Sequence, residues 1–160
     1  MRFAVLWILL LAILQPLLID TDYSELSDDF NISFSENSGV EVISELEPND
    51  SNTTGQEVYP GDVIRGTVDM WDDKHDWYSV WLEPGQTLLL TLSHASGDGV
   101  SMSVWDEENT HWGSSNPAKT RDTIFLDEDE TEVGGVYSVS INATMTEAGG
   151  GAYVLEIDAG

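Results

Sequence analysis

The chain lacks cysteine altogether, so its 160 residues hold no disulfide, no zinc–thiolate site and no thiol nucleophile. Basic residues are scarce too: five Lys and Arg stand against thirty Asp and Glu, for a formal net charge of −25. This charge argues against nucleic acid and anionic membrane surfaces as partners, because both repel an acidic protein. Cations and cationic surfaces are the partners that the charge favours.

Catalytic motifs are missing as well. The sequence contains no H-E-x-x-H, no G-x-S-x-G and no phosphate-binding glycine loop. His75 lies in an acidic turn, where it fits a surface histidine better than a metal ligand, because no partner histidine is near. With thirty acidic residues, a carboxylate pair suited to glycoside hydrolysis carries no information. We therefore expect a protein that is not an enzyme.

Residues 1–19 are mostly apolar. Arg2 precedes the run Phe3 to Leu14, and Leu17 to Ile19 extend it. The pattern predicts a secretory signal peptide or, if it is left uncut, an N-terminal membrane anchor, since no A-x-A cleavage site follows and the run is about long enough to span a bilayer. Either outcome exports the rest of the chain to the extracellular space or the cell surface, with the membrane touched only through this segment.

Residues 20–44 are rich in Ser, Asp, Asn and Glu, and their few aromatic residues follow no period. This composition predicts an acidic flexible linker. A single folded domain is then expected over residues 45–158, a length sufficient for one hydrophobic core.

The segment ELEPNDS, from Glu45 to Ser51, begins that domain. In an extended chain alternate side chains point the same way, so Glu45, Glu47 and Asn49 can converge while Pro48 stiffens the path. Oxygen ligands of this kind suit calcium, which tolerates irregular coordination. Asp50 adds a further carboxylate to the segment.

A second acidic group follows in WDDKHDWY, where Asp72, Asp73 and Asp76 could close the same site from the other side. The alternative is an acidic linker followed by a solvated turn, with no metal. The sequence therefore predicts calcium as a cofactor and leaves this alternative open.

Strand-like alternation governs the remainder, and no segment of useful length has a helical period. YPGD (Tyr59 to Asp62) and EPGQ (Glu83 to Gln86) place Pro and Gly as type II turns require. We predict an all-β fold, an antiparallel β-sandwich of jelly-roll type with six to eight short strands. The clearest strands are 63–69, 77–83, 87–93 and 100–105, followed by apolar rows at Ile124 and Leu126, at Tyr137, Val139 and Ile141, and at Tyr153, Leu155 and Ile157.

Two loops, Asp106 to Arg121 and Asp127 to Gly135, are long or acidic enough to carry a binding surface.

The order of motifs ELEPNDS, GDVIRGTV, DDKHDWYSVWLEPGQTLLLTL, GGVYSVSI and AYVLEI resembles the bacterial and archaeal pre-peptidase C-terminal domain. This secreted β-sandwich is commonly appended to proteases and is related to the collagen-binding domains of clostridial collagenases. The resemblance spans about Glu45 to Asp158, and the pairing of E-x-E-P-N-D with a later D-W-Y strand carries most of its specificity.

In the collagenase relatives the E-x-E-P-N-D segment binds calcium together with aspartates of a D-D-x-D turn. The resemblance thus implies a site formed by the residues at matching positions, with Asp76 as the last aspartate. The chain reads DDKHD, so the choice between Asp72 and Asp73 stays open. Collagen binding does not transfer by analogy.

Trp77 and Trp81 share the strand face opposite to Tyr78, Val80 and Leu82. If the latter face the core, the two indoles could bind sugar or an extended peptide from outside; the alternative is that they pack beneath the acidic loops. Four N-x-S/T sequons, possible glycosylation sites in an exported protein, occur at Asn31, Asn49, Asn52 and Asn142. Glycosylation and calcium binding compete at Asn49.

The sequence as a whole predicts a secreted or surface-tethered, non-catalytic, calcium-binding β-sandwich that attaches to or stabilises an extracellular protein or polysaccharide. Two alternatives remain: a metal-independent carbohydrate- or peptide-binding module that uses Trp77 and Trp81, and a purely structural surface domain.

Overall fold

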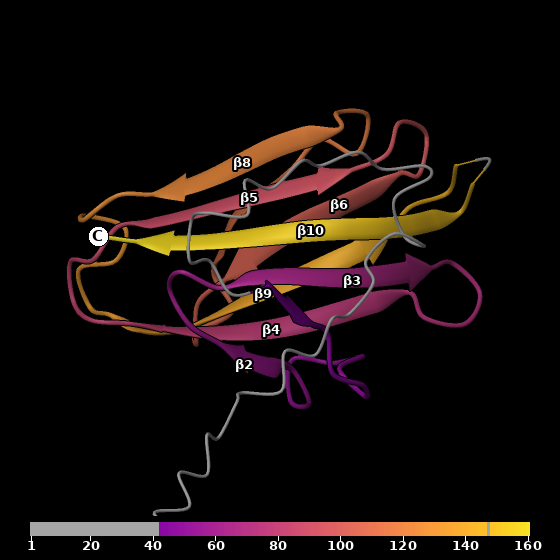
Figure 1. Cartoon of the computed structure of the whole chain (residues 1–160). Helices are drawn as coiled ribbons and strands as arrows, with labels where there is room; N and C mark the ends of the chain where they lie inside the picture. Colours follow the sequence, from indigo (N-terminus) through magenta and orange to yellow (C-terminus); the bar gives the residue numbers. More distant parts are fainter. Residues whose placement is uncertain (1–41, 147) are drawn as a thin grey trace, which may run out of the picture.

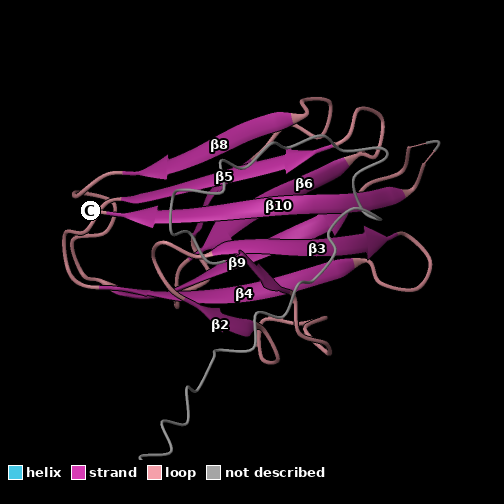
Figure 2. Cartoon of the chain, viewed as in Figure 1, coloured by secondary structure: helices cyan, strands magenta, loops and turns pink. Residues whose placement is uncertain are grey.

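The computed structural model describes residues 42–146 and 148–160, which form ten strands and no helix (Figures 1 and 2). The strands are β1 (Val42–Ser44), β2 (Gln56–Val58), β3 (Val63–Asp69), β4 (His75–Leu82), β5 (Leu88–His94), β6 (Val100–Trp105), β7 (His111–Ser114), β8 (Arg121–Leu126), β9 (Gly135–Ala143) and β10 (Gly150–Ala159). In this part of the chain there is no helix long and apolar enough to cross a membrane. The predicted signal segment 1–19 and most of the predicted linker lie outside the described residues.

Two five-stranded sheets pack face to face, in the orders β1-β3-β10-β5-β8 and β2-β4-β9-β6-β7. Figure 1 shows them as two layers, with β3, β10, β5 and β8 in front of β4, β9 and β6. The predicted all-β sandwich is confirmed. The sheets are mixed, however, because the edge strands β1 and β2 run parallel to β3 and β4.

The parallel edges follow from how the chain begins. It alternates between the sheets from β1 to β4, so β1 and β3 are joined by a crossing that includes β2 in the opposite sheet. Parallel strands require such a crossover, whereas a short turn joins antiparallel ones. The other strand pairs in the described part of the chain are antiparallel.

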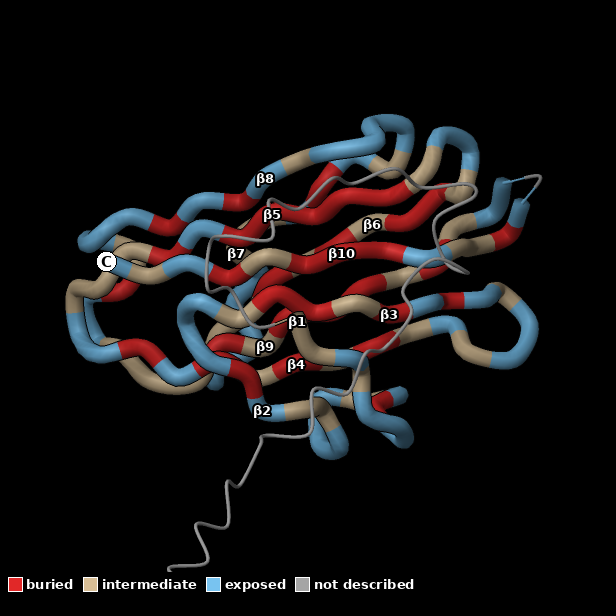
Figure 3. Tube along the Cα trace, in the orientation of Figure 1, coloured by how far each residue is buried: buried red, intermediate tan, exposed pale blue. Residues whose placement is uncertain are grey.

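Burial alternates along the strands as the sequence predicts. On β4, Tyr78, Val80 and Leu82 are at most 1% exposed, because they point between the sheets, while Trp77 and Trp81 point outward. Figure 3 shows the buried stretches along the middle of the strands and the exposed ones in the loops at both ends. Apolar side chains from both sheets make up one continuous core.

Both predicted Pro-Gly turns form. Gly61 and Gly85 have φ angles of 96° and 76°, which a type II turn needs at its third position and which glycine adopts without steric cost. The amides of Asp62 and Gln86 close these turns onto the carbonyls of Tyr59 and Glu83, at 3.0 and 3.1 Å.

Short strands occupy segments that the sequence assigns to irregular chain. Residues Val42–Ser44, at the end of the predicted linker, form β1, and His111–Ser114, within the loop predicted from Asp106 to Arg121, form β7. Strands of three or four residues hold too few alternating positions to give a period of two, so only their pairing with a longer neighbour defines them.

Candidate metal site

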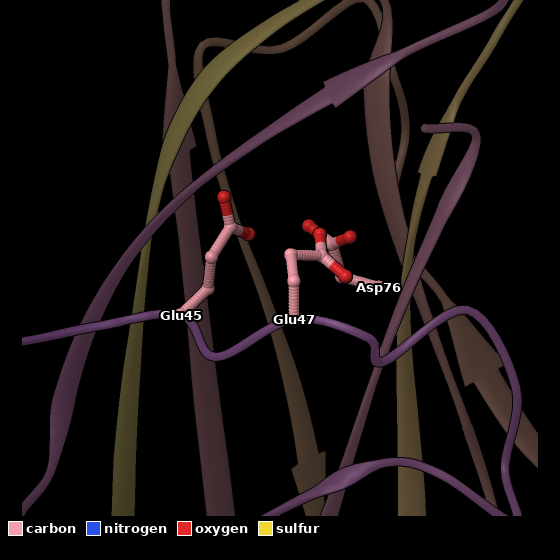
Figure 4. A group of neighbouring side chains, drawn as sticks. All are labelled: Glu45, Glu47 and Asp76. Atoms are coloured by element: carbon pink, nitrogen blue, oxygen red, sulfur yellow. The ribbon is translucent and has the colours of Figure 1, made fainter. Parts of the chain in front are cut away.

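The site begins where the chain leaves β1. The amide of Glu45 donates to the carbonyl of Arg65 (2.9 Å), which keeps the segment alongside β3. Glu45 and Glu47 project from this segment to the same side (Figure 4), as alternate residues of an extended chain do. The predicted convergence of these two carboxylates is therefore present in the structure.

The carboxylate of Glu45 is fixed from two directions. Its Oε1 accepts hydrogen bonds from the amide (2.9 Å) and hydroxyl (3.2 Å) of Thr67 on β3. Its Oε2 accepts from the hydroxyl of Tyr153 on β10 (3.1 Å). Glu45 thus ties the entering chain to the front sheet.

The next residues turn toward the other sheet. The peptide bond between Glu47 and Pro48 is cis. Glu47 Oε2 accepts from the amide of Asn49 (3.0 Å), and the carbonyl of Asn49 accepts from the amide of Trp77 on β4 (2.8 Å). Asn49 is wholly buried, which is exceptional for a polar residue in a connecting segment.

Asp76 completes the cluster from β4, directly beside Glu47 (Figure 4). It points inward with Tyr78 and is wholly buried. Its Oδ2 accepts from the hydroxyl of Tyr153 at 2.5 Å, and that hydroxyl also contacts the hydroxyl of Tyr78. Carboxylate oxygens of Glu45, Glu47 and Asp76 lie within 4.8 Å of one another. Asp76 is buried, Glu45 half-buried and Glu47 exposed, and we call these three residues the carboxylate cluster.

A glycine makes this arrangement possible. Gly66 lies on β3 opposite Tyr153 of β10, and a Cβ atom at residue 66 would overlap the Tyr153 hydroxyl and Glu45 Oε2. Glycine inside a strand marks such close approaches. Gly66, Thr67, Tyr78 and Tyr153 are site residues that the sequence reasoning missed. The available signals were a glycine in an otherwise regular strand and two tyrosines in inward apolar rows, whose hydroxyls need partners when buried.

The protonation of the aspartates reflects burial among like charges. Burial, together with the neighbouring Glu45 and Asp73, raises the pKa of Asp76 to about 9 despite the hydrogen bond from Tyr153, which lowers it. Burial, followed by the charges of Glu47 and Glu45, raises the pKa of Asp73 to about 6. A cation placed among these groups would relieve both effects, because it favours the charged carboxylates.

A further observation fits a cation: Asp73 Oδ1 is buried and makes no hydrogen bond. The side chain of Asn49 satisfies its neighbours best with its nitrogen inward, donating to Glu47 Oε2 and Asp76 Oδ1 at 3.2 Å each. Binding a cation would require this amide to turn so that its oxygen faces the carboxylates, which would complete an all-oxygen ligand set of the kind that calcium prefers.

The structure divides the predicted ligands into two groups. Glu45, Glu47, Asn49 and Asp76 come together, and Asp73 lies near enough to be affected by their charges. Asp50 and Asp72 are exposed. The amide of Asp72 donates to Asp69 Oδ1 in the turn after β3 (3.3 Å), so between the two adjacent aspartates the geometry favours Asp73.

No protein-family model matches the chain, and no curated protein matches it. Among solved structures, the fold is similar to the pre-peptidase C-terminal domain of a collagenase from Bacillus anthracis, with a TM-score of 0.51 over 65% of this chain and 94% of that domain. The chain has a pre-peptidase C-terminal-like fold. At 14% identity the likeness concerns the fold alone, and at that level it confirms the resemblance stated from the sequence.

A second solved structure, the periplasmic inhibitor of g-type lysozyme PliG from Aeromonas hydrophila, is also 14% identical. The match covers 61% of this chain and 84% of the inhibitor, with a TM-score of 0.44. This value is too low for structural inference, so the pre-peptidase C-terminal-like fold rests on the collagenase domain.

Within this pre-peptidase C-terminal-like fold the predicted aromatic residues differ in exposure. Trp81 is 56% exposed, whereas Trp77 is half-buried, with its ring centroid 5.2 Å from that of Trp105 on β6. Both project from the outer face of their sheet, as the alternation predicts.

The sequons also differ in accessibility. Asn52 is exposed and Asn142 is half-buried, while Asn31 lies outside the described residues. At the wholly buried Asn49, a glycan would require the side chain to leave the site, so folding and glycosylation oppose one another there.

The two loops predicted to carry a binding surface, Asp106 to Arg121 and Asp127 to Gly135, meet at the Gly135 end of β9, which is the end away from the metal site. Together they line a pocket of about 290 Å³ with carboxylates and with the rings of Trp112 and Tyr137. Asp106 at its rim accepts hydrogen bonds from the amides of Glu108 and Thr110 and from Trp112 Nε1, at 2.9, 2.8 and 3.1 Å. These carboxylates are partly or fully exposed, and three of them, Asp106, Glu107 and Glu130, already accept hydrogen bonds from backbone amides.

Proposed function

We propose that this protein is an exported, non-catalytic β-sandwich module that binds calcium and uses the surface so ordered to attach to extracellular material. The observation that carries the proposal is the carboxylate cluster, in which Glu45, Glu47 and Asp76 meet within 4.8 Å. Glu47 is exposed and Glu45 half-buried, but Asp76 is wholly buried, and a proton or a cation there would offset the repulsion between the three groups. Calcium supplies that charge and accepts oxygen ligands alone.

The ligands come from two parts of the chain. Glu45, Glu47 and Asn49 belong to the segment that enters the domain, and Asp76, with Asp73 beside it, belongs to the start of β4. Bound calcium would therefore hold the entering segment against β4. Its role is mechanical, because calcium here would fix the position of one segment on the sandwich and carry out no reaction.

Export and attachment rest on the sequence. The apolar run within residues 1–19 supports a signal or an anchor, and the extreme acidity supports a cation-rich environment. Extracellular calcium modules bind with dissociation constants of about 10⁻⁴ to 10⁻³ M. At about 100 times the dissociation constant, calcium would add roughly 2.7 kcal/mol to the free energy of unfolding.

Thermal unfolding of the full chain tests the proposal. The protein is heated in chelator, in millimolar calcium and in millimolar magnesium, and the series is repeated on Glu47→Ala and on a matched variant, Glu57→Ala. Glu57 is an exposed carboxylate on β2 that accepts from the hydroxyl of Tyr59 (3.0 Å).

Calcium is expected to raise the melting temperature by several degrees in the parent protein and in Glu57→Ala. Glu47→Ala should lose that rise, and magnesium should give little of it, because it requires stricter octahedral geometry. Equal melting temperatures of the parent protein in chelator and in calcium would refute the calcium site.

A further inference from the structure

A trough crosses the outer face of the sheet β2-β4-β9-β6-β7, away from the carboxylate cluster. Trp77 on β4 lies opposite Ser140 on β9, and Trp105 on β6 lies opposite Ser138 of the same strand. Because serine is small, the two indoles meet above β9, with ring centroids 5.2 Å apart and planes inclined by 33°. At this separation the two half-buried rings overlap as a tilted, offset aromatic pair.

The aromatic surface continues toward β7 and lies within a depression. The ring of His111 is 5.4 Å from that of Trp105. Two adjoining hollows, of about 240 and 500 Å³, share Trp77, Trp105 and Asn52 as lining residues. The rings therefore form the floor of a trough, and the segment after the metal site forms one of its walls.

Polar side chains surround this floor. Ser51 and Asn52 lie on the wall, and Asn142 on β9 is held in place by His75 Nδ1, which donates to its Oδ1 (2.7 Å). Carboxylates occupy the two ends of the trough, Asp50 at one and Asp106 with Glu107 at the other. The trough combines flat apolar rings with hydroxyl, amide and carboxylate groups that can donate or accept.

We propose that this trough binds an uncharged saccharide chain, with its sugar rings against Trp77 and Trp105. A pyranose presents apolar C–H groups on its faces and hydroxyls around its edge, so it needs both an aromatic floor and a polar rim. The carboxylates at the two ends accept hydrogen bonds from sugar hydroxyls and repel acidic sugars. Charge thus selects neutral over anionic polysaccharides.

The same observations disfavour an extended peptide. Peptides gain much of their affinity by adding a strand to an open sheet edge. The trough lies instead over the middle of its sheet, where β9 is paired with β4 on one side and β6 on the other. A peptide placed there would find side chains only, so it could not satisfy its own backbone groups through the sheet.

This site goes beyond calcium binding and differs from a site built on Trp77 and Trp81. Trp81 lies four residues further along β4, opposite Val136, and is not among the residues that line the trough. The trough is nevertheless linked to the metal site, because the carbonyl of Asn49 accepts from the amide of Trp77 and residues 50–52 follow directly.

The test measures binding of the full chain to hexasaccharides of glucose, mannose and N-acetylglucosamine, using tryptophan fluorescence and calorimetry, in calcium and in chelator. Oligogalacturonate of the same length is the anionic control, and a lysine-rich collagen-like peptide is the peptide control. At least one neutral hexasaccharide is expected to bind, and the oligogalacturonate and the peptide are not.

The variants are Trp77→Ala, Trp105→Ala and Trp105→Phe, with Trp71→Ala as the matched control because Trp71 is 83% exposed in the turn after β3. Both alanine variants should weaken binding at least tenfold, Trp105→Phe should weaken it less, and Trp71→Ala should leave it unchanged. Far-UV circular dichroism and the calcium-dependent melting temperature confirm that each variant is folded.

Failure of every neutral saccharide to bind would overturn the proposal, even with calcium stabilisation intact. Binding of the peptide alone, or an equal loss in Trp71→Ala, would overturn it as well. If saccharide binding survives in Glu47→Ala, the saccharide proposal holds even where the calcium site is refuted. The two proposals can therefore be refuted independently.

Discussion

In two acidic regions of this molecule the pKa values of aspartates are shifted in opposite directions. In the carboxylate cluster, burial and neighbouring charges raise the pKa of Asp76 to about 9. In the loop after β6, burial alone would raise the pKa of Asp106, but hydrogen bonds from Thr110, Trp112 and Glu108 outweigh it and lower the pKa. Acidity by itself therefore does not indicate a cation site.

What separates the regions is how fully the protein's own donors satisfy the buried carboxylate oxygens. Asp106 receives three hydrogen bonds from its own loop, and Asp122 receives one from Lys119 Nζ (2.9 Å) and one from the amide of Asn116 (2.9 Å). In the cluster, Glu45 accepts from Thr67, and the single Tyr153 hydroxyl is shared between Glu45 and the buried Asp76. Asp73 Oδ1 is buried and has no partner. A cation site is expected where buried carboxylate oxygens share or lack a donor.

Replacing Asp76 by Asn should have the largest effect. The substitution removes one charged ligand of calcium and keeps the shape of the side chain, so calcium should bind on the order of 100-fold more weakly, about 2.7 kcal/mol. In chelator the melting temperature should stay the same or rise, because Asn replaces a carboxyl group whose pKa burial raises to about 9.

Calorimetry with calcium and thermal unfolding in chelator measure these two effects. Asp72→Asn is the matched control, because Asp72 is exposed on the same turn. Equal calcium affinities of the two variants would remove Asp76 from the site.

Tyr153→Phe should come next. Its hydroxyl serves Asp76, Glu45 and Tyr78 at once, so its loss leaves buried polar atoms without a partner and should cost about 1–3 kcal/mol of unfolding free energy in chelator. Urea unfolding gives the difference. Tyr59→Phe is the control, because the Tyr59 side chain is 59% exposed and its hydroxyl donates to the exposed Glu57. A loss of similar size in both variants would contradict the central role of the Tyr153 hydroxyl.

The pH dependence of folding stability should have opposite signs for the aspartates of the two regions. Asp76 and Asp73 have raised pKa values of about 9 and about 6, so in chelator the folded state keeps protons that the unfolded state has lost. Their contribution is complete below about pH 4 and declines as pH rises through 6 and 9. Asp106 and Asp122, whose pKa values are lowered, contribute above about pH 4 and lose that contribution as pH falls.

Calcium should oppose the loss of stability that Asp76 and Asp73 cause as pH rises, because it binds the deprotonated carboxylates and therefore stabilises the fold more at higher pH. Melting temperatures from pH 4 to 9, in chelator and in calcium, test this. Parallel curves in the two conditions would show that calcium and protons do not compete at the cluster.

Asp106→Ala should have the smallest effect. It removes three hydrogen bonds from a half-buried loop position, with an expected cost of about 1 kcal/mol, and it should leave the calcium response intact. Urea unfolding in chelator and in calcium provides both quantities. A reduced calcium response in this variant would mean that the loop carboxylates share in cation binding.

Much of the fold could be predicted from the sequence because long strands repeat one signal many times. Along β4, four outward and four inward positions alternate, and the Pro-Gly turns mark where strands end. This reasoning does not detect β1, β2 and β7. A strand of three or four residues shows no period, and its pairing depends on residues that are distant in the sequence. The parallel direction of the edges depends on the crossing between sheets, which local patterns do not encode.

The site shows a similar division. Glu45, Glu47 and Asn49 follow from alternation in a short extended segment, and Asp76 follows from the acidic group in WDDKHDWY and from the resemblance. Thr67, Gly66 and Tyr153 come from strands that pair only in the folded molecule, and so they could not be placed beside Glu45 from spacing. The partnership of Trp77 with Trp105 depends likewise on β9 lying between their strands.

The short first strand also has a consequence for self-association. β1 covers one side of β3 with only three residues and leads directly into Glu45, whose amide and carboxylate both bond to β3. Were this segment to detach, the seven-residue strand Val63–Asp69 would become an open edge, which is a template for strand addition by another copy. The residues that hold the entering chain in place thus also protect this edge of β3 from edge-to-edge aggregation.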